Sequence, residues 1–325
     1  MAQETPTAPG TIPLPPVDEV QITTIMDNSL DMLMAGNEVA RRIALGPNPF
    51  ERQQPIAQHG FSVRLRVRQG AKSGDVLFDT GVSREGTLHN LDALEVRLNE
   101  VQAIVLSHGH ADHALGLTGI IERLGTRRMP LVLHPDSYLA RKLILPNGDE
   151  LHIPPPHKAD FARDNIQVIE EIGPSLLVDG MVLISGEVSR ATDFETGFPI
   201  HYAKHGDVWE PDPVIHDDQC AIVNVRDKGL VVVSGCGHAG IVNILLHAKA
   251  LTGVEQIYAV VGGFHLTGAI FEPRIAPTVA ALQTLDPRYL VPGHCTGWRA
   301  TQEIARAMPD AFVANSVGTT FVFAA

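Results

Sequence analysis

Basic residues and long apolar runs are both scarce in this chain of 325 residues. Lys and Arg together number 25 against 37 Asp and Glu, which gives a formal net charge of −12. Proteins that neutralise nucleic-acid phosphates carry a basic surface, so this balance disfavours that role. The longest apolar stretches, such as residues 230–234 and 257–261, are far shorter than the roughly 20 residues that cross a bilayer. We therefore expect no nucleic-acid partner and no membrane span.

Cysteine is also rare, since Cys220, Cys236 and Cys295 are the only three. Three thiols do not make a disulfide framework, and the odd number fits a reducing compartment or a thiol kept for its reactivity or for metal. The N-terminus lacks the basic start and apolar run of a secretory signal, so a cytoplasmic location is expected. A chain whose export signal has been removed is the alternative. Residues 1–19 are rich in proline and are expected to form a disordered arm.

The rest of the chain mixes strand and helix patterns along its whole length. Residues 61–67 alternate apolar and polar side chains, and residues 101–106 form an apolar run, which indicates two strands. Residues 241–251 and 275–285 have the spacing of helices. Hairpins and strand–helix–strand units together predict a layered α/β fold with mixed sheets, in one domain over residues 20–325.

Residues 144–217 differ from the rest of this expected domain. They contain eight prolines and five histidines and have weak periodicity. Long irregular segments of this kind run over the surface and often border a binding site. We expect an elaboration that walls the pocket, with a merely decorative insertion as the alternative.

Histidine is the abundant residue, with 15 against only 4 Tyr and 2 Trp. The densest group is Ser107-His108-Gly109-His110-Ala111-Asp112-His113, directly after the expected strand at residues 101–106. Side chains alternate in an extended segment, so His108 and His110 point the same way. Asp112 and His113 follow where the chain turns into a helix, and adjacent residues in such a turn diverge and can address different metal ions. Four such ligands within six positions predict a site for zinc, manganese or iron.

The His-x-His-x-Asp-His pattern, preceded by Asp79-Thr80-Gly81, resembles the metallo-β-lactamase superfamily. Three later stretches are similar to its dihydropteroate-synthase-like, or ribofuranosylaminobenzene-phosphate-synthase-like, branch: residues 234–238 (SGCGH), 262–266 (GGFHL) and 292–297 (PGHCTG). The resemblance implies a four-layer αββα sandwich, in which two mixed sheets pack face to face with helices outside. It also implies a metal site at one edge, where loops from both halves meet.

The resemblance further implies two divalent metal ions, zinc first, with manganese or iron as alternatives. One ion would be bound by His108, His110 and a further histidine. The other would be bound by Asp112, His113 and the late histidine of the Pro-Gly-His stretch, His294.

The sequence does not decide two of the ligands, the further histidine of the first ion and the residue between the two ions. The further histidine is either His238, two residues after Cys236, or His216, which lies in the region where relatives more often carry that histidine. Of the two we favour His238. Cys236 stands where relatives commonly carry an aspartate between the ions. It is either a bridging thiolate or a small buried core residue.

The other histidines and cysteines have weaker patterns. His265 follows an expected strand and either contacts substrate, supports a ligand or is structural. His134 has the same alternatives with a weaker case, and Cys220 and Cys295 are expected to be packing residues. The histidines expected on the surface or in loops are His59, His89, His152, His157, His201, His205 and His247.

The predicted chemistry is hydrolysis of an ester, lactone or phosphodiester of a small molecule. Two ions about 3.5–4 Å apart can hold a hydroxide between them and polarise a substrate oxygen. Asp112 would be the catalytic residue, which orients that hydroxide or takes its proton. The alternatives are a mononuclear-iron thiol or persulfide dioxygenase on the same fold, and a ligand-binding relative without catalysis.

Overall fold

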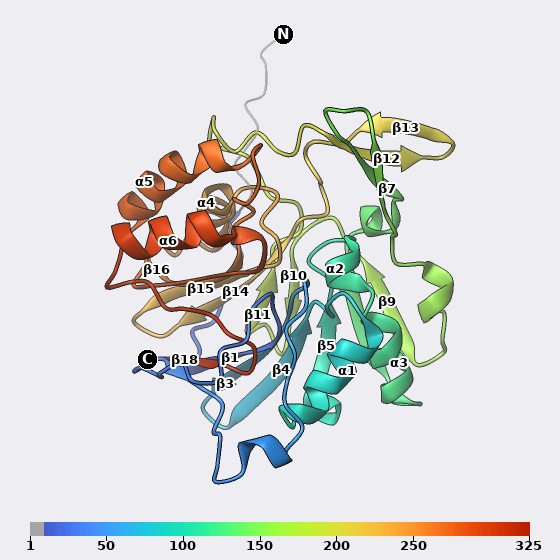
Figure 1. The fold of residues 1–325 in the computed structure, drawn as a ribbon. Helices are drawn as coiled ribbons and strands as arrows, with labels where there is room; N and C mark the ends of the chain where they lie inside the picture. Colours follow the sequence, from blue (N-terminus) through green and yellow to red (C-terminus); the bar gives the residue numbers. More distant parts are fainter. Residues whose placement is uncertain (1–9) are drawn as a thin grey trace.

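Two mixed β-sheets pack face to face in the computed structural model, which describes residues 10–325 (Figure 1). The first sheet has eight strands, and its half from β4 to β9 is parallel. In spatial order its strands are β2 (Ala40–Arg41), β18 (Thr320–Ala324), β1 (Glu19–Met26), β3 (Ser62–Gln69), β4 (Lys72–Phe78), β5 (Val101–Val105), β6 (Met129–Leu133) and β9 (Ile166–Glu170).

The second sheet has six strands and is parallel only from β15 to β17. Its strands in spatial order are β10 (Ser175–Leu177), β11 (Val182–Ile184), β14 (Cys220–Val225), β15 (Gly229–Ser234), β16 (Ile257–Gly263) and β17 (Tyr289–Gly293). The hairpin between β14 and β15 turns at Asp227, whose φ of 58° matches the turn chemistry of that position.

Three apolar clusters hold the layers together. The central cluster joins the facing sides of the two sheets through residues such as Phe78, Val231 and Phe321. A second cluster packs the outer side of the second sheet against α4 (Ile241–Thr252), α5 (Ile275–Leu285) and α6 (Trp298–Ala307). A third packs the first sheet against α1 (Arg84–Ala93) and α3 (Leu117–Leu124), and the short α2 (Ala111–Ala114) precedes α3. The predicted sandwich of two mixed sheets with helices outside is therefore confirmed.

None of the helices within residues 10–325 has the length and apolar character needed to cross a membrane.

A third, four-stranded antiparallel sheet was not predicted. It projects beside the sandwich (Figure 1) and orders β13 (Val208–Pro211), β12 (His201–His205), β7 (Arg141–Ile144) and β8 (Glu150–Ile153). The segment predicted as one elaboration, residues 144–217, is thus divided. Its middle part supplies β9 to the first sheet and β10 and β11 to the second, so only its two ends build the added sheet.

The predicted arm also needs a correction, because its second half packs on the sandwich. The Ile12 amide donates to the Leu251 carbonyl at 2.7 Å, and Leu14 and Val17 are buried. These apolar side chains find a place beside the second sheet, which outweighs the tendency of a proline-rich stretch to stay solvated. The first nine residues of the predicted arm lie outside the described residues.

Helix α4 begins directly after the loop that carries Cys236 and His238, and a distant carboxylate caps it. The residue before the helix, Gly240, offers no side-chain cap. Instead the buried Glu195 accepts the Val242 amide at 2.9 Å and the Asn243 amide at 2.8 Å. Negative charge at this end also suits the helix dipole.

We expect Glu195→Gln to lower the free energy of unfolding by about 1–3 kcal/mol, because the carboxamide turns an NH₂ group toward one of two buried amides. Urea denaturation of the metal-free protein measures the change. The matched control is Glu303→Gln, which removes only an exposed i,i+3 pair with Arg306 and should change the value by less than about 0.5 kcal/mol. Equal stability of the two variants would contradict the capping role.

Candidate metal centre

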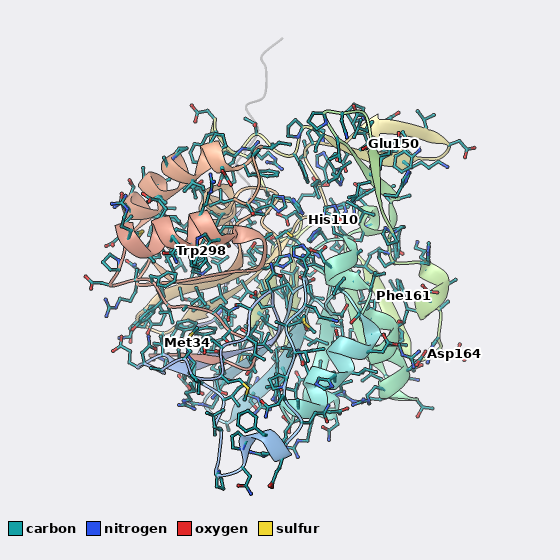
Figure 2. All side chains as sticks on the ribbon, viewed as in Figure 1. Met34, His110, Glu150, Phe161, Asp164 and Trp298 are labelled. Atoms are coloured by element: carbon teal, nitrogen blue, oxygen red, sulfur yellow. The ribbon has the colours of Figure 1, made fainter. Side chains whose placement is uncertain are left out.

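The predicted ligands lie together at one edge of the sandwich, where parallel strands from both sheets end. His108 and His110 follow β5, and Cys236 and His238 follow β15. His294 follows β17 and begins a one-turn 3-10 helix, η6 (His294–Thr296). Figure 2 shows His110 in the region between the two helical layers, beside α2. His113 and His294, which are 181 positions apart in the sequence, thus meet at this edge.

The first group consists of His108, His110 and His238, all buried. One nitrogen from each ring lies within 4.8 Å of the others. The closest pair is His110 Nδ1 and His238 Nε2 at 3.1 Å. His108 directs Nδ1 to the Ser107 hydroxyl at 2.9 Å, and its buried Nε2 has no hydrogen-bond partner among the described residues.

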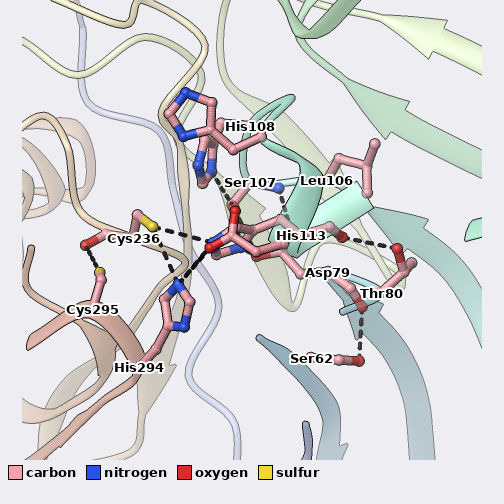
Figure 3. A network of polar contacts seen from close by, with 12 residues as sticks. Ser62, Asp79, Thr80, Leu106, Ser107, His108, His113, Cys236, His294 and Cys295 are labelled. Atoms are coloured by element: carbon pink, nitrogen blue, oxygen red, sulfur yellow. Dashed lines mark hydrogen bonds and ion pairs between the residues drawn. The ribbon is translucent and has the colours of Figure 1, made fainter. Parts of the chain in front are cut away.

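The second group consists of Asp112, His113, Cys236 and His294. The last three of these are labelled in Figure 3. His113 Nε2 lies 3.1 Å from both Cys236 Sγ and His294 Nε2. Cys236 Sγ is 3.3 Å from His294 Nε2, and Asp112 Oδ2 is 3.2 Å from the same nitrogen. Three of these side chains are fully covered, while the Asp112 side chain is 20% exposed.

Cys236 lies between the two groups, since it also clusters with His238 and His265. The Cys295 thiol donates to the Cys236 carbonyl at 3.1 Å, so Cys295 packs behind the site rather than in it (Figure 3). This placement suits the predicted bridging thiolate, whose role as a ligand stays a prediction.

The donor set fits a metal ion. Imidazole nitrogens, a thiolate and a carboxylate are ligands of zinc and iron. A buried ring nitrogen such as His108 Nε2 is costly to leave without a partner, and an ion among these ligands would satisfy it. Each of the two groups therefore has suitable donor atoms close enough together to hold a metal ion.

Asp79 fixes the second group from behind. Its buried carboxylate accepts from the Ser107 amide at 2.6 Å and the Ser107 hydroxyl at 2.7 Å, and it lies 2.7 Å from His113 Nδ1 (Figure 3). This contact leaves His113 Nε2 directed at the ligand group, as second-sphere carboxylates do at metal sites. Gly235 passes so close to Ser107 and Asp79 that a Cβ there would overlap them, which explains the glycine before Cys236.

Electrostatics favour the ligand forms of the three histidines in the first group and of Asp112. Burial lowers the pKa of His108, His110 and His238 well below the usual value, which keeps the rings neutral. Burial acts to raise the pKa of Asp112, but the neighbouring imidazoles of His113 and His294 outweigh it and hold that pKa far below its usual range.

Burial raises the pKa of the Cys236 thiol. Burial acts to lower the pKa of His113, but that pKa is raised because Asp79 and Asp112 lie beside its ring. These two side chains therefore have to lose a proton when a metal binds.

The backbone at the site is strained. Asp79, His265 and His294 have φ values of 60°, 43° and 46°, in the left-handed region that non-glycine residues seldom adopt. Such conformations cost about 1–3 kcal/mol each and persist where the surroundings impose them. Here the surroundings are the strand ends that aim these side chains at the edge.

Of two further histidines proposed from the sequence, His216 lies away from the ligand groups and His265 lies beside them. His216, the alternative third histidine, is 53% exposed and lies 3.6 Å from Glu187, outside all three ligand groups. His265 lies against His238 with ring centroids 4.1 Å apart and packs edge-on to Phe271. Its Nδ1 is buried without a partner among the described residues.

Sequence reasoning missed two histidines at this edge. His201, expected on the surface, is fully buried on β12 and its Nε2 lies 3.0 Å from His110 Nε2. His59 is 68% exposed, as expected, but borders the site 3.6 Å from Asp112 Oδ2. No sequence pattern places either histidine beside the ligands, because each contact joins segments that are far apart in the sequence.

Comparison with known proteins agrees with this fold. The family model described as the metallo-beta-lactamase superfamily matches residues 67–251. A crystal structure described as a metal-dependent hydrolase of the beta-lactamase superfamily has a TM-score of 0.71 with this chain, covers 94% of this chain and 100% of its own, and is 24% identical. That likeness shows the fold.

The curated relatives are more varied in name. A 7,8-dihydropterin-6-methyl-4-(beta-D-ribofuranosyl)-aminobenzene-5'-phosphate synthase of Methanocaldococcus jannaschii is 29% identical over 276 residues, which are 82% of this chain and 90% of the relative. A ribonuclease Z of Nocardia farcinica is 42% identical over 87 residues, which are 26% of each chain.

Proposed function

This chain belongs to the metallo-β-lactamase superfamily, and on that premise we propose that it is a metal-dependent hydrolase of a small-molecule ester, lactone or phosphodiester. The observation that carries the proposal is the pair of adjacent ligand groups with Cys236 between them. Zinc is the preferred metal, because histidine nitrogen, thiolate and carboxylate suit it together.

Each group would hold one ion. His108, His110 and His238 would bind the first, and Asp112, His113 and His294 the second, with Cys236 in the shared position. When bound, the ions would lower the pKa of a water molecule from about 15.7 toward 7 and polarise the oxygen of the substrate.

The residues of the chain position the attacking water. Asp112 is the ligand that solvent and substrate can reach, since the other members of its group are covered. Its carboxylate is ionised at neutral pH, so its free oxygen can accept a hydrogen bond from the attacking water and hold that water in position to lose its proton.

A narrow cavity lies beside His238 and has room for about one water molecule, so it would take at most a small group of a substrate. His265, Phe271 and Arg274 contribute to its wall. The Arg274 guanidinium and the Glu195 carboxyl group both line this cavity, so acidic and basic groups face it together, and the net charge of −12 disfavours a nucleic-acid polymer. His265 is placed to contact the substrate or to support His238.

The name of the methanogen relative supplies a second candidate, formation of a pterin-linked ribofuranosyl-aminobenzene phosphate. Its support is the 29% identity over 82% of this chain. Incubation with ribofuranosyl-aminobenzene phosphate and a dihydropterin that carries a leaving group on its 6-methyl carbon, followed by mass spectrometry for the joined product and the released group, tests it. Appearance of the joined product would place synthesis ahead of hydrolysis.

We expect protein purified without chelators or added metal to contain about two zinc ions per chain by mass spectrometry. Removal of the ions with a chelator should reduce hydrolysis of a panel of lactones, esters and phosphodiesters to background, and added zinc should restore it. Heat-unfolded protein with the same zinc serves as the control. Hydrolysis that survives removal of the metal would contradict the proposal, and a single iron with thiol-dependent oxygen uptake would favour the dioxygenase.

A further inference from the structure

We propose that His201 is a positioning residue for the metal centre. It holds His110 in the tautomer that is protonated at Nε2, so that the unprotonated Nδ1 faces the other ligands. The inference rests on the metal centre of the proposed function and adds a residue that lies outside every ligand group. His201 comes from β12 of the added sheet and is 91 residues from His110 in the sequence.

The hydrogen-bond partners of His201 determine its tautomer. Its Nδ1 lies 2.8 Å from the Asp212 carbonyl oxygen and 3.4 Å from the Asp212 carboxylate. Both of these groups only accept, so Nδ1 carries the proton. In the neutral ring Nε2 is then an acceptor, and it lies 3.0 Å from His110 Nε2.

The consequence passes to His110. Two imidazole nitrogens at 3.0 Å need one donor and one acceptor, and with His201 accepting, His110 must donate from Nε2. Neutral His110 then has an unprotonated Nδ1, the atom that lies 3.1 Å from His238 Nε2. The lone pair needed by a metal ion is therefore directed into the group with His108 and His238.

A second contact from the same sheet fixes the loop itself. The buried Arg141 on β7 pairs with Asp217 at 2.6 Å, and Asp217 accepts the Gly109 amide at 2.7 Å. Gly109 lies between the two histidines, and a Cβ there would overlap the Ser137 backbone. The added sheet thus holds the His-Gly-His loop at its backbone and at one ring.

Zinc affinity of the metal-free protein, measured by competition with a chromophoric chelator, tests the proposal without a substrate. His201→Phe keeps an aromatic ring but has no acceptor, and it should raise the Kd of one zinc ion about 10–100-fold. His201→Gln offers an amide oxygen in place of Nε2 and should stay within a few-fold of the wild type. His205→Phe, on the exposed end of the same strand, is the matched control and should change nothing.

The outcomes separate a positioning role from packing. Wild-type affinity in His201→Phe would overturn the proposal, and so would a Gln variant as weak as the Phe variant. Circular dichroism checks that each variant folds. Should His201→Phe fail to fold, His201→Asn replaces it, because its shorter amide does not reach His110. A protein that binds zinc in this pattern and hydrolyses nothing would contradict the proposed function alone.

Discussion

Asp112→Asn is expected to reduce turnover at least about a hundredfold while the fold stays intact. The carboxamide keeps the size of the side chain and one oxygen, but it lacks the ionised oxygen that holds the attacking water in position to lose its proton. It also removes the negative charge that lies 3.2 Å from His294 Nε2 and 3.7 Å from His113 Nε2. Turnover of the zinc-loaded variant, at matched metal content, measures the effect.

The matched control for this exchange is Asp164→Asn, an exposed aspartate far from His110 in Figure 2. It should retain the turnover of the wild type. Near-full activity in a folded, zinc-loaded Asp112→Asn protein would remove Asp112 from the mechanism. A variant that loses turnover only because it binds no zinc would assign Asp112 to metal binding alone.

The ligands of the His-x-His-x-Asp-His motif could be predicted because their information is local. His108, His110, Asp112 and His113 lie within six positions after an apolar strand, and that strand is β5. The other main strands and helices with strong periodicity, such as β3 and α4, also occur close to their expected bounds. In these segments the local hydrophobic pattern agrees with the burial in the folded protein. Secondary structure can be predicted from sequence where the two agree.

The added sheet could not be predicted for the opposite reason. Its strands have four or five residues, and β8 is largely exposed, so no alternation marks a buried face. β18 was missed as well, because a strand at the end of the chain pairs with β1 about 300 positions away. In both cases the strand forms through pairing with a segment that is distant in the sequence. Local strand propensity does not predict such pairing.

The expectation that His201 lies on the surface was wrong for the same reason, because non-local strand pairing decides its position. A histidine in a polar, proline-rich stretch resembles a loop residue until β12 pairs with β7 and carries it against His110. Its counterpart Asp79 was noticed only as part of a motif. The structure gives its contact with His113 Nδ1, and this contact explains why a buried carboxylate follows β4.

The third histidine of the first group is the point at which the sequence left two choices, and metal content distinguishes them. His238→Ala should reduce bound zinc from about two ions to about one per chain, because it removes one of three nitrogens that lie within 4.8 Å of one another. His216→Ala should leave zinc content unchanged, since that ring is 53% exposed and faces Glu187. Mass spectrometry of both proteins, purified side by side, measures the difference.

The result depends on which of the two variants, His238→Ala or His216→Ala, loses zinc. If His216→Ala lost the ion and His238→Ala kept it, the first group would be wrongly composed, and the contact between His238 Nε2 and His110 Nδ1 would be a packing contact. If both variants kept two ions, His108 and His110 would hold zinc with Cys236 alone. Loss of both ions from His238→Ala would show that the two groups bind cooperatively, which their contact through Cys236 makes physically reasonable.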